Sequence, residues 1–478
     1  MLFNSFAFAV FLPIVFILYW ALPHKFRWIM MLIASYYFYI SWNAKYVFLI
    51  LFTTVISYLA ARLLEKEDNK EKKKLILAGT ATLCFGVLFF FKYFNFVSES
   101  VTHFLSLFVI RVNPLILNLL LPVGISFYTF QTLSYVIDVY KGDVPAEHHF
   151  GYYATFISFF PQLVAGPIER TRNLLPQIKD EHIFDYDQAT YGLKLMAWGY
   201  FKKLAIADVI SVYVDNAYAD LWSCTGCDLV IAIFFFTIQI YCDFSGYSDI
   251  AIGTAKLLGI NLMFNFKSPY MSLSVKEFWS KWHISLSTWF RDYVYIPLGG
   301  NRVSKLRNYF NLLVTFLLSG LWHGANWTYV IWGGIHGIAQ VGEKAFNLEN
   351  KGQSKKIFRL IKWGLVFAFC NFAWVFFRAE SVNDAITVFY RIIISFSDIR
   401  NFAHNTIGLS KKAFRGILLL IGILAIYDYL SLKFDVICKI SEKPIILRWI
   451  LYLLLIVVTF FSYVTMGVSN ASFVYFQF

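Results

Sequence analysis

The feature that most constrains this chain is the recurrence of apolar runs long enough to cross a lipid bilayer. Of its 478 residues, 59% are hydrophobic and 15% are charged, whereas a soluble chain carries about a quarter charged residues. The connections between the runs are too short for a soluble domain. The sequence therefore predicts an all-α protein that spans a membrane about a dozen times. The predicted spans lie near residues 6–22, 27–43, 46–63, 75–94, 104–121, 123–140, 151–166, 189–215, 228–241, 309–327, 328–345, 361–378, 413–431 and 447–467.

Lys and Arg concentrate in three connections, residues 62–74, 301–308 and 351–362. Basic residues in short loops favour the cytoplasmic side of a membrane, so we expect all three loops there. Residues 309–350 would then form a helical hairpin that enters the membrane and returns. These loops also account for much of the net charge of +13. Nucleic-acid binding is not predicted, because the chain lacks a basic helix or an aromatic and basic platform.

One apolar stretch, "SGLWHGANWTYVIWGGIHG" (319–337), contains His323 and His336. An imidazole in a bilayer is costly unless it has a partner or lines a wet cavity. Glycines spaced four apart in the same stretch permit close helix packing, so a structural role for His323 is one interpretation. The other, which we favour, is a neutral general base in a low-dielectric pocket. On one continuous helix His336 would lie about 20 Å from His323, so the two cannot share a site unless the chain turns between them. We expect His336 to be structural.

Residues 241–302 depart from the simple apolar pattern. "YCDFSGYSDIAIG" (241–253) places polar residues within an apolar run, and 268–302 is amphipathic and rich in Trp and Tyr. Polar or irregular backbone at membrane depth persists only where it is buried in protein or lines water. We therefore expect 241–302 to form the wall of an internal cavity or tunnel and to be partly re-entrant.

Cysteine spacing and short motifs exclude several classes of site. Cys224 and Cys227 form a lone C-x-x-C without the second ligand pair that a zinc site needs, and whether they form a disulfide stays open. The sequence contains no G-x-S-x-G, Walker A, H-E-x-x-H or G-x-G-x-x-G motif. We expect neither a metal site nor a bound cofactor.

Five segments together resemble the membrane-bound O-acyltransferase superfamily, and most closely its bacterial branch. Members of that branch acetylate alginate, peptidoglycan or cellulose, or D-alanylate teichoic acid. The resemblance implies a ring of tilted transmembrane helices with re-entrant segments around a central tunnel. It also implies a single membrane domain, 1–478, with N-terminal helices (1–119), a catalytic core (120–340) and C-terminal helices (341–478). The segments are "LLPVGISFYTFQTLSYVIDVY" (120–140), "QLVAGPIER" (162–170), "YCDFSGYSDIAIG" (241–253), "FWSKWHISLSTWFRDYVYIPLGGNR" (278–302) and "LWHGANWTYVIWGGIHG" (321–337).

The same resemblance implies the roles of individual residues. The family's essential tunnel histidine corresponds to His323, the expected general base, and its second site histidine corresponds to His283. Three further residues are expected to support the two histidines. Two arginines are expected to bind the phosphates of the donor. The supporting residues are Asp243, Asn326 and Trp322, and the arginines are Arg291 and Arg302.

The substrates implied by the resemblance lie on opposite sides of a bacterial plasma membrane. The donor would be acetyl-CoA from the cytoplasm. The acceptor would be hydroxyls of an extracytoplasmic glycan similar to alginate, peptidoglycan or cellulose, reached directly or through a periplasmic or surface-anchored acyltransferase partner.

A transporter is the alternative hypothesis. Asp243, His283 and His323 would then mark a proton or substrate path through the membrane. Transporters often contain internal repeats with paired broken helices, and this sequence has no such repeat, which favours the enzyme.

Overall fold

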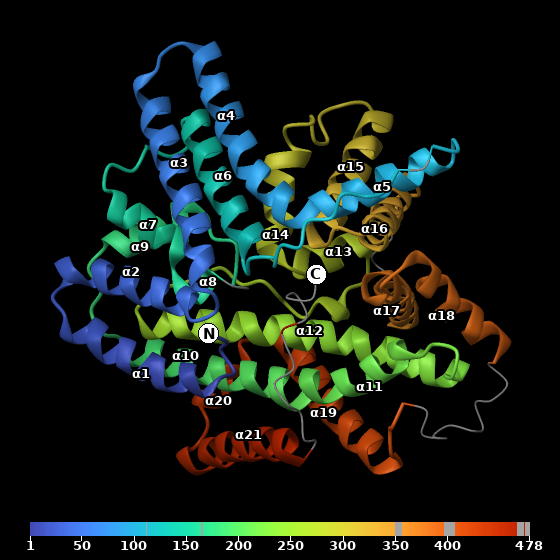
Figure 1. Ribbon diagram of the computed structural model, residues 1–478. Coiled ribbons are helices and arrows are strands. Elements are labelled where there is room, and N and C mark those ends of the chain that lie inside the picture. The colour runs from blue at the N-terminus through green and yellow to red at the C-terminus, as the bar shows by residue number, and fades with distance from the viewer. Residues whose placement is uncertain (111, 164–165, 349–355, 396–406, 466–472, 474–478) are drawn as a thin grey trace. The chain divides into compact units, whose positions relative to one another are not determined.

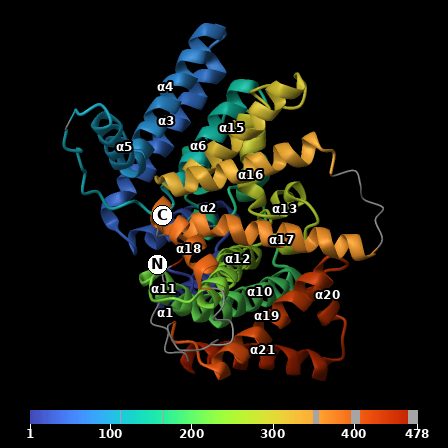
Figure 2. The ribbon, with the colours of Figure 1, turned by 90° about the vertical axis from the view of Figure 1, so that its right-hand side faces the viewer.

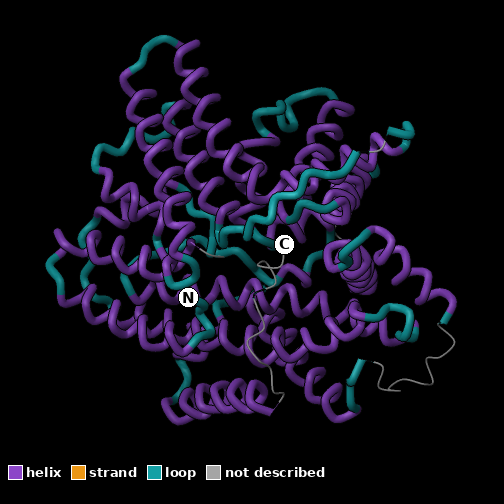
Figure 3. Tube along the Cα trace, viewed as in Figure 1, coloured by secondary structure: helices purple, strands orange, loops and turns teal. Residues whose placement is uncertain are grey.

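The computed structural model describes residues 1–478 except 111, 164–165, 349–355, 396–406, 466–472 and 474–478. Within these described ranges the chain forms helices joined by turns and loops, and no β-strand (Figure 3). The all-α prediction is therefore confirmed. The chain divides into two compact units, Met1–Lys194 with Ile250–Met263, and Leu195–Asp249 with Phe264–Phe478.

In the first unit, α3 and α4 pack against α6 (Figure 1). The face of α3 that is buried carries small residues, including Ser57 and Ala61, while Leu59 and Leu63 are exposed. Asn69 accepts hydrogen bonds from the backbone of Glu71 and Lys72 and so begins α4. The helices of this unit are α1 (Phe6–Ala21), α2 (His24–Ile40), η1 (Ala44–Tyr46), α3 (Val47–Lys66), α4 (Lys70–Leu88), η2 (Phe89–Tyr93), α5 (Phe94–Ser106), α6 (Ile125–Lys141), α7 (Phe150–Ser158), α8 (Phe160–Leu163) and α9 (Thr171–Lys179).

The predicted span at 104–121 is wrong. Helix α5 ends at Ser106, and residues 112–121 are not helical. Asn95 of α5 exchanges two hydrogen bonds with the backbone of Leu117, at 2.8 and 3.0 Å, and Ser98 accepts one from Leu115 at 2.8 Å. Asn95 and Ser98 therefore supply hydrogen bonds to three backbone groups of this apolar segment, at Leu115 and Leu117, in place of helical ones.

In the second unit, α15 and α16 form an antiparallel pair beside α17 (Figure 2). Helix α10 (Tyr186–Tyr200) runs from the first unit into the second, and α12 contributes to both. The remaining helices are η3 (Phe201–Ala207), α11 (Asp208–Ala219), α12 (Gly226–Leu257), η4 (Pro269–Met271), α13 (Val275–Lys281), α14 (Ile284–Phe290), η5 (Arg291–Tyr295), α15 (Lys305–His323), α16 (Trp327–Ala345), α17 (Lys356–Arg378), α18 (Val382–Ile394), α19 (Lys411–Ser431), α20 (Val436–Ser441) and α21 (Ile445–Thr465).

The two parts of the region 241–302 differ in backbone structure. Residues 241–253 belong to α12, a continuous helix of 32 residues, so no break occurs there. The polar side chains of this stretch find partners inside the protein, including Lys202 for Ser245 and Asp428 for Tyr241, so the helix can stay regular. By contrast, 268–302 consists of short helices and turns, as expected from its polar, aromatic sequence.

Six helical stretches among the described residues are long and apolar enough to cross a membrane. This is fewer than the predicted dozen, because several apolar runs are broken into short pieces. The run at 151–166, for example, becomes α7 and the short α8. The six stretches are Ala44–Lys66, Lys70–Ser106, Gly226–Leu257, Lys356–Arg378, Lys411–Ser431 and Ile445–Val464.

Candidate functional site

The hairpin predicted for residues 309–350 is present as α15 and α16. Its two helices approach so closely that a methyl group added at Gly320 or Gly333 would overlap backbone of the other helix. The chain turns at Gly324–Asn326, where the Asn326 side chain accepts a hydrogen bond from the Thr328 backbone at 3.0 Å and so begins α16. His323 is the last residue of α15 and lies at the tip of the hairpin, with Lys305 at the opposite end.

His323 is buried in an aromatic cluster, with 2% of its surface exposed. The centroid of its ring lies 5.0 Å from those of Trp322 and Trp332, and 5.4 Å from that of Phe377. Aromatic side chains therefore enclose the imidazole and keep most of it out of contact with water.

His283 occupies the position before α14 with a φ of +42°, in the left-handed region that few non-glycine residues adopt. Its side chain is fully buried and contacts Phe244 edge-on, with ring centroids 4.6 Å apart. Burial lowers the pKa of His283 to about 3, so this imidazole is neutral at physiological pH. A residue held in an uncommon backbone conformation is consistent with a functional site.

The structure brings His283 and His323 together, with ring centroids 6.4 Å apart. Trp322 contacts both rings, at 6.0 and 5.0 Å. These three residues, predicted as site residues, therefore form one buried group in the second unit.

Asp243 is buried on α12, one residue before Phe244, and forms an ion pair with Lys203 at 2.6 Å. The Lys203 ammonium also contacts Asp208, at 2.8 Å. Asp243 therefore lies next in sequence to Phe244, which contacts His283. Its carboxylate pairs with Lys203, which was not predicted as a site residue. The sequence contains a hint of this pairing, since "FKK" places adjacent lysines inside the apolar run 189–215.

The other predicted site residues are Asn326, Arg291 and Arg302. The Asn326 amide donates to the Glu380 carbonyl at 2.7 Å, so both ends of this side chain hold the hairpin turn. Arg291 and Arg302 are exposed, and Arg291 pairs with Asp292 at 2.8 Å. Exposure leaves both guanidinium groups accessible to a soluble ligand.

His336 lies closer to His323 than the continuous-helix argument expected, because the chain turns between them. Trp332 bridges the two, with its ring centroid 5.0 Å from each imidazole. His336 is fully buried, and its Nδ1 accepts a hydrogen bond from Trp279 at 3.1 Å.

Other groups of possible chemical interest do not form a metal or disulfide site. Across the described ranges, no group of three or more His, Cys, Asp or Glu side chains is placed to hold a metal ion. Cys224 and Cys227 are both free thiols.

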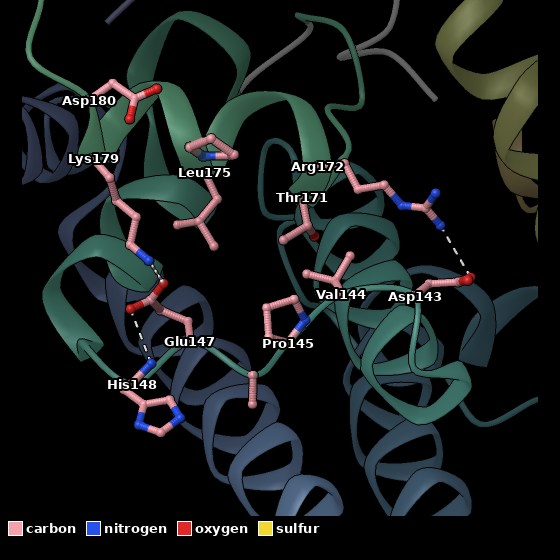
Figure 4. A pocket seen from close by; sticks show the side chains of 12 residues that line it. Asp143, Val144, Pro145, Glu147, His148, Thr171, Arg172, Leu175, Lys179 and Asp180 are labelled. Carbon is pink, nitrogen blue, oxygen red and sulfur yellow. Dashed lines mark hydrogen bonds and ion pairs between the residues drawn. The ribbon is translucent and has the colours of Figure 1, made fainter.

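The first unit contains a pocket of about 570 Å³ between the loop after α6 and helix α9 (Figure 4). Its charges are largely paired with one another, Lys179 with Glu147 at 2.5 Å and Arg172 with Asp143 at 3.2 Å. The pocket therefore presents little surplus charge to a ligand. It is lined by Asp143, Val144, Pro145, Ala146, Glu147, His148, Thr171, Arg172, Leu175, Pro176, Lys179 and Asp180.

The sequence of this chain is similar to known acyltransferases over most of its length. The model of the membrane-bound O-acyltransferase family matches residues 144–380, which include His283 and His323. A probable alginate O-acetylase of Pseudomonas syringae is 41% identical over 83% of this chain and 75% of its own length. A peptidoglycan O-acetyltransferase of Helicobacter pylori is 36% identical over 81% of this chain and 79% of its own length. A teichoic acid D-alanyltransferase of Streptococcus thermophilus is 31% identical over 52% of this chain and 64% of its own length.

Proposed function

Because this chain belongs to the membrane-bound O-acyltransferase family, we propose that it transfers an acetyl group from cytoplasmic acetyl-CoA to hydroxyls of an extracytoplasmic glycan. The chain is an acyltransferase and a multi-pass protein of the bacterial inner membrane. The observation that carries the proposal is the buried pair of His283 and His323, whose ring centroids lie 6.4 Å apart within the matched region.

His323 is the general base of the proposed reaction. Its neutral imidazole accepts the proton of the acceptor hydroxyl while the hydroxyl oxygen attacks the thioester carbonyl carbon. The carbon–sulfur bond then breaks, and the leaving thiolate takes the proton from the imidazolium. The products are the acetyl ester and free CoA, so no proton is gained or lost overall.

His283 positions the thioester in this proposal. Its low pKa keeps the ring neutral, so the ring binds the acyl group through hydrogen bonds and not through charge. Its left-handed backbone fixes the ring against Phe244. Asp243 supports the same wall of the site, because its ion pair with Lys203 anchors α12 next to Phe244.

Arg291 and Arg302 are proposed to bind the phosphates of the donor. Both are exposed. Arg302 lies in the basic loop 301–308, which is expected in the cytoplasm where acetyl-CoA is made, and Arg291 precedes that loop in η5. Guanidinium groups bind phosphate oxygens well because their N–H donors form a planar fork. In this proposal the acyl group reaches His323 through a tunnel in the protein.

We propose the acceptor from the substrates that appear in the names of the relatives. Those names give alginate, peptidoglycan and teichoic acid. The alginate and peptidoglycan enzymes are matched over most of their length, so we propose an acetylated glycan of the alginate, peptidoglycan or cellulose kind. A periplasmic or surface-anchored acyltransferase completes the transfer where this chain does not contact the glycan directly.

The test in cells uses a strain lacking this gene, complemented with wild type, His323→Ala or His103→Ala. His103 is an exposed histidine on α5 and serves as the matched control. Extracytoplasmic polysaccharide is purified, and acetate released by mild alkali is measured. Wild type and His103→Ala restore ester-linked acetate, whereas His323→Ala does not.

The same variants are then purified in detergent and given acetyl-CoA labelled in the acetyl group. Wild type is expected to release free CoA in the presence of the acceptor extract, and His323→Ala is expected to lose this activity by at least about a hundredfold. Equal CoA release by wild type and a folded His323→Ala protein would overturn the role of His323.

A further inference from the structure

Three N–H groups in the aromatic cluster around His323 have no hydrogen-bond acceptor among the residues that the structure describes. They are Nε1 of Trp282, Nε1 of Trp332 and Nε2 of His336, and all three side chains are fully buried. Most buried polar groups in folded proteins are hydrogen-bonded, because a buried donor without a partner loses its water and gains nothing in return. A group of three in one cluster therefore needs an explanation.

Two other indole groups of the same cluster have acceptors in the protein. Trp374 donates to the Tyr270 hydroxyl at 3.0 Å, and Trp279 donates to His336 Nδ1 at 3.1 Å. The hydrogen bond from Trp279 also assigns the tautomer of His336. Because Nδ1 accepts this hydrogen bond, the neutral ring carries its proton on Nε2. Nε2 is therefore a donor and needs an acceptor.

These donors lie beside the proposed base. The ring centroid of Trp332 is 5.0 Å from that of His323 and 5.0 Å from that of His336. Trp282 joins the group through Trp374, which lies 5.0 Å from Trp282 and 5.5 Å from Trp332. Trp332 therefore contacts the proposed base directly, and His336 contacts Trp332.

We infer that Trp332 and His336 form a carbonyl-binding site for the acyl donor, with Trp282 as a further donor along the same cluster. This inference rests on the proposed function. An acyl-CoA brings a thioester carbonyl and the amide carbonyls of its pantetheine arm, and all of these oxygens accept hydrogen bonds. N–H groups already placed around a thioester oxygen also stabilise the negative charge that develops there during attack.

Two analogues of the donor separate this role from simple packing. Acetonyl-CoA is a ketone that keeps the carbonyl oxygen but cannot transfer its acetyl group, and S-propyl-CoA has the same carbon chain without that oxygen. Their affinities are measured by calorimetry with detergent-purified wild type, Trp332→Phe and Trp374→Phe. Trp374→Phe is the matched control, because it also removes an indole from the cluster, but one whose N–H already has a partner in the protein.

We expect wild type to bind the ketone about tenfold more tightly than the thioether, as one hydrogen bond predicts. Trp332→Phe removes this preference and lowers turnover of acetyl-CoA, whereas Trp374→Phe weakens both analogues equally and keeps the ratio. The inference is overturned if wild type binds both analogues alike, or if folded Trp332→Phe keeps the preference. If wild type binds neither analogue nor CoA, the proposed donor itself is wrong, and the inference fails with it.

Discussion

The Lys203 ammonium lies 2.6 Å from the Asp243 carboxylate, and both side chains are almost completely buried. The same ammonium contacts Asp208 at 2.8 Å. Lys203 sits in η3, a turn of π-helix, which is an irregularity that proteins often place near functional sites. One lysine therefore holds two carboxylates from different helices, α11 and α12.

Replacement of Lys203 with Met is expected to destabilise the protein by about 3–5 kcal/mol, because two buried carboxylates lose their counter-charge. Thermal unfolding in detergent measures the change. Lys439→Met is the control, since its pair with Glu442 is exposed and contributes about 0–1 kcal/mol. Similar melting temperatures for the two variants would show that the buried ion pair is not important for stability.

The close approach of α15 and α16 makes a second prediction. Gly333→Ala places a methyl group against the Phe316 carbonyl oxygen, whereas the neighbouring Gly334→Ala meets only the flexible end of Leu317. We expect Gly333→Ala to cost about 1–3 kcal/mol of stability and to lower acyl transfer, since it moves the hairpin that carries His323. Gly334→Ala is expected to behave like wild type in both measurements, and equal effects at the two positions would contradict the close packing.

Two substitutions at His283 separate the effect of its imidazole on acyl transfer from the effect of its left-handed backbone on stability. His283→Ala and His283→Gly both remove the imidazole, so both are expected to lose acyl transfer. Glycine adopts the left-handed conformation without strain, so His283→Gly is expected to be more stable than His283→Ala by about 1 kcal/mol. Thermal unfolding and CoA release are measured on the same samples. A more stable Ala variant would argue against the left-handed backbone.

Glu169, in the loop before α9, is a buried carboxyl whose oxygens accept hydrogen bonds from Met263 N at 2.5 Å and Asn173 at 2.6 Å. Burial raises the pKa of Glu169 from its usual 4.5 to about 7. A raised carboxyl pKa means that the folded protein holds the proton more tightly than the unfolded chain. Its contribution to stability is therefore full below pH 4.5 and is lost as the pH rises to about 7.

Glu169→Gln tests this pH dependence, because glutamine, like the protonated carboxyl, carries no charge and does not titrate. Between pH 4.5 and 7, wild type is expected to lose stability relative to the Gln variant by on the order of 1 kcal/mol per pH unit. Melting temperatures across this range give the difference. A constant gap between the two proteins at all pH values would show that Glu169 does not titrate there.

The sequence allowed the hairpin and its histidine to be predicted, because both depend on local patterns. Basic residues mark the two ends of 309–350, and the glycine spacing marks helices that touch. The pairing of His283 with His323 came from the family resemblance, since no local pattern brings together residues forty positions apart.

Long-range pairing explains what the sequence did not reveal. The apolar run 112–121 reads as a membrane helix until Asn95 and Ser98 are seen to bind its backbone. In the same way, the sequence does not show the partners of the polar residues of 241–253, because the lysines that pair with Asp243 and Asp249 lie in a different segment. The position of His336 depends on the turn at Gly324–Asn326, which lies a few residues before the boundary expected between the spans 309–327 and 328–345.

The close glycine contacts hold α15 and α16 together as one packed unit, with His323 at one end and charged residues at the other. Lys344 also ties the two helices together there, through a hydrogen bond to Asn308 at 2.5 Å. The basic residues at this end are expected at the cytoplasmic surface of the membrane. Because the two helices pack so closely, the length of the hairpin sets how far His323 lies from that end.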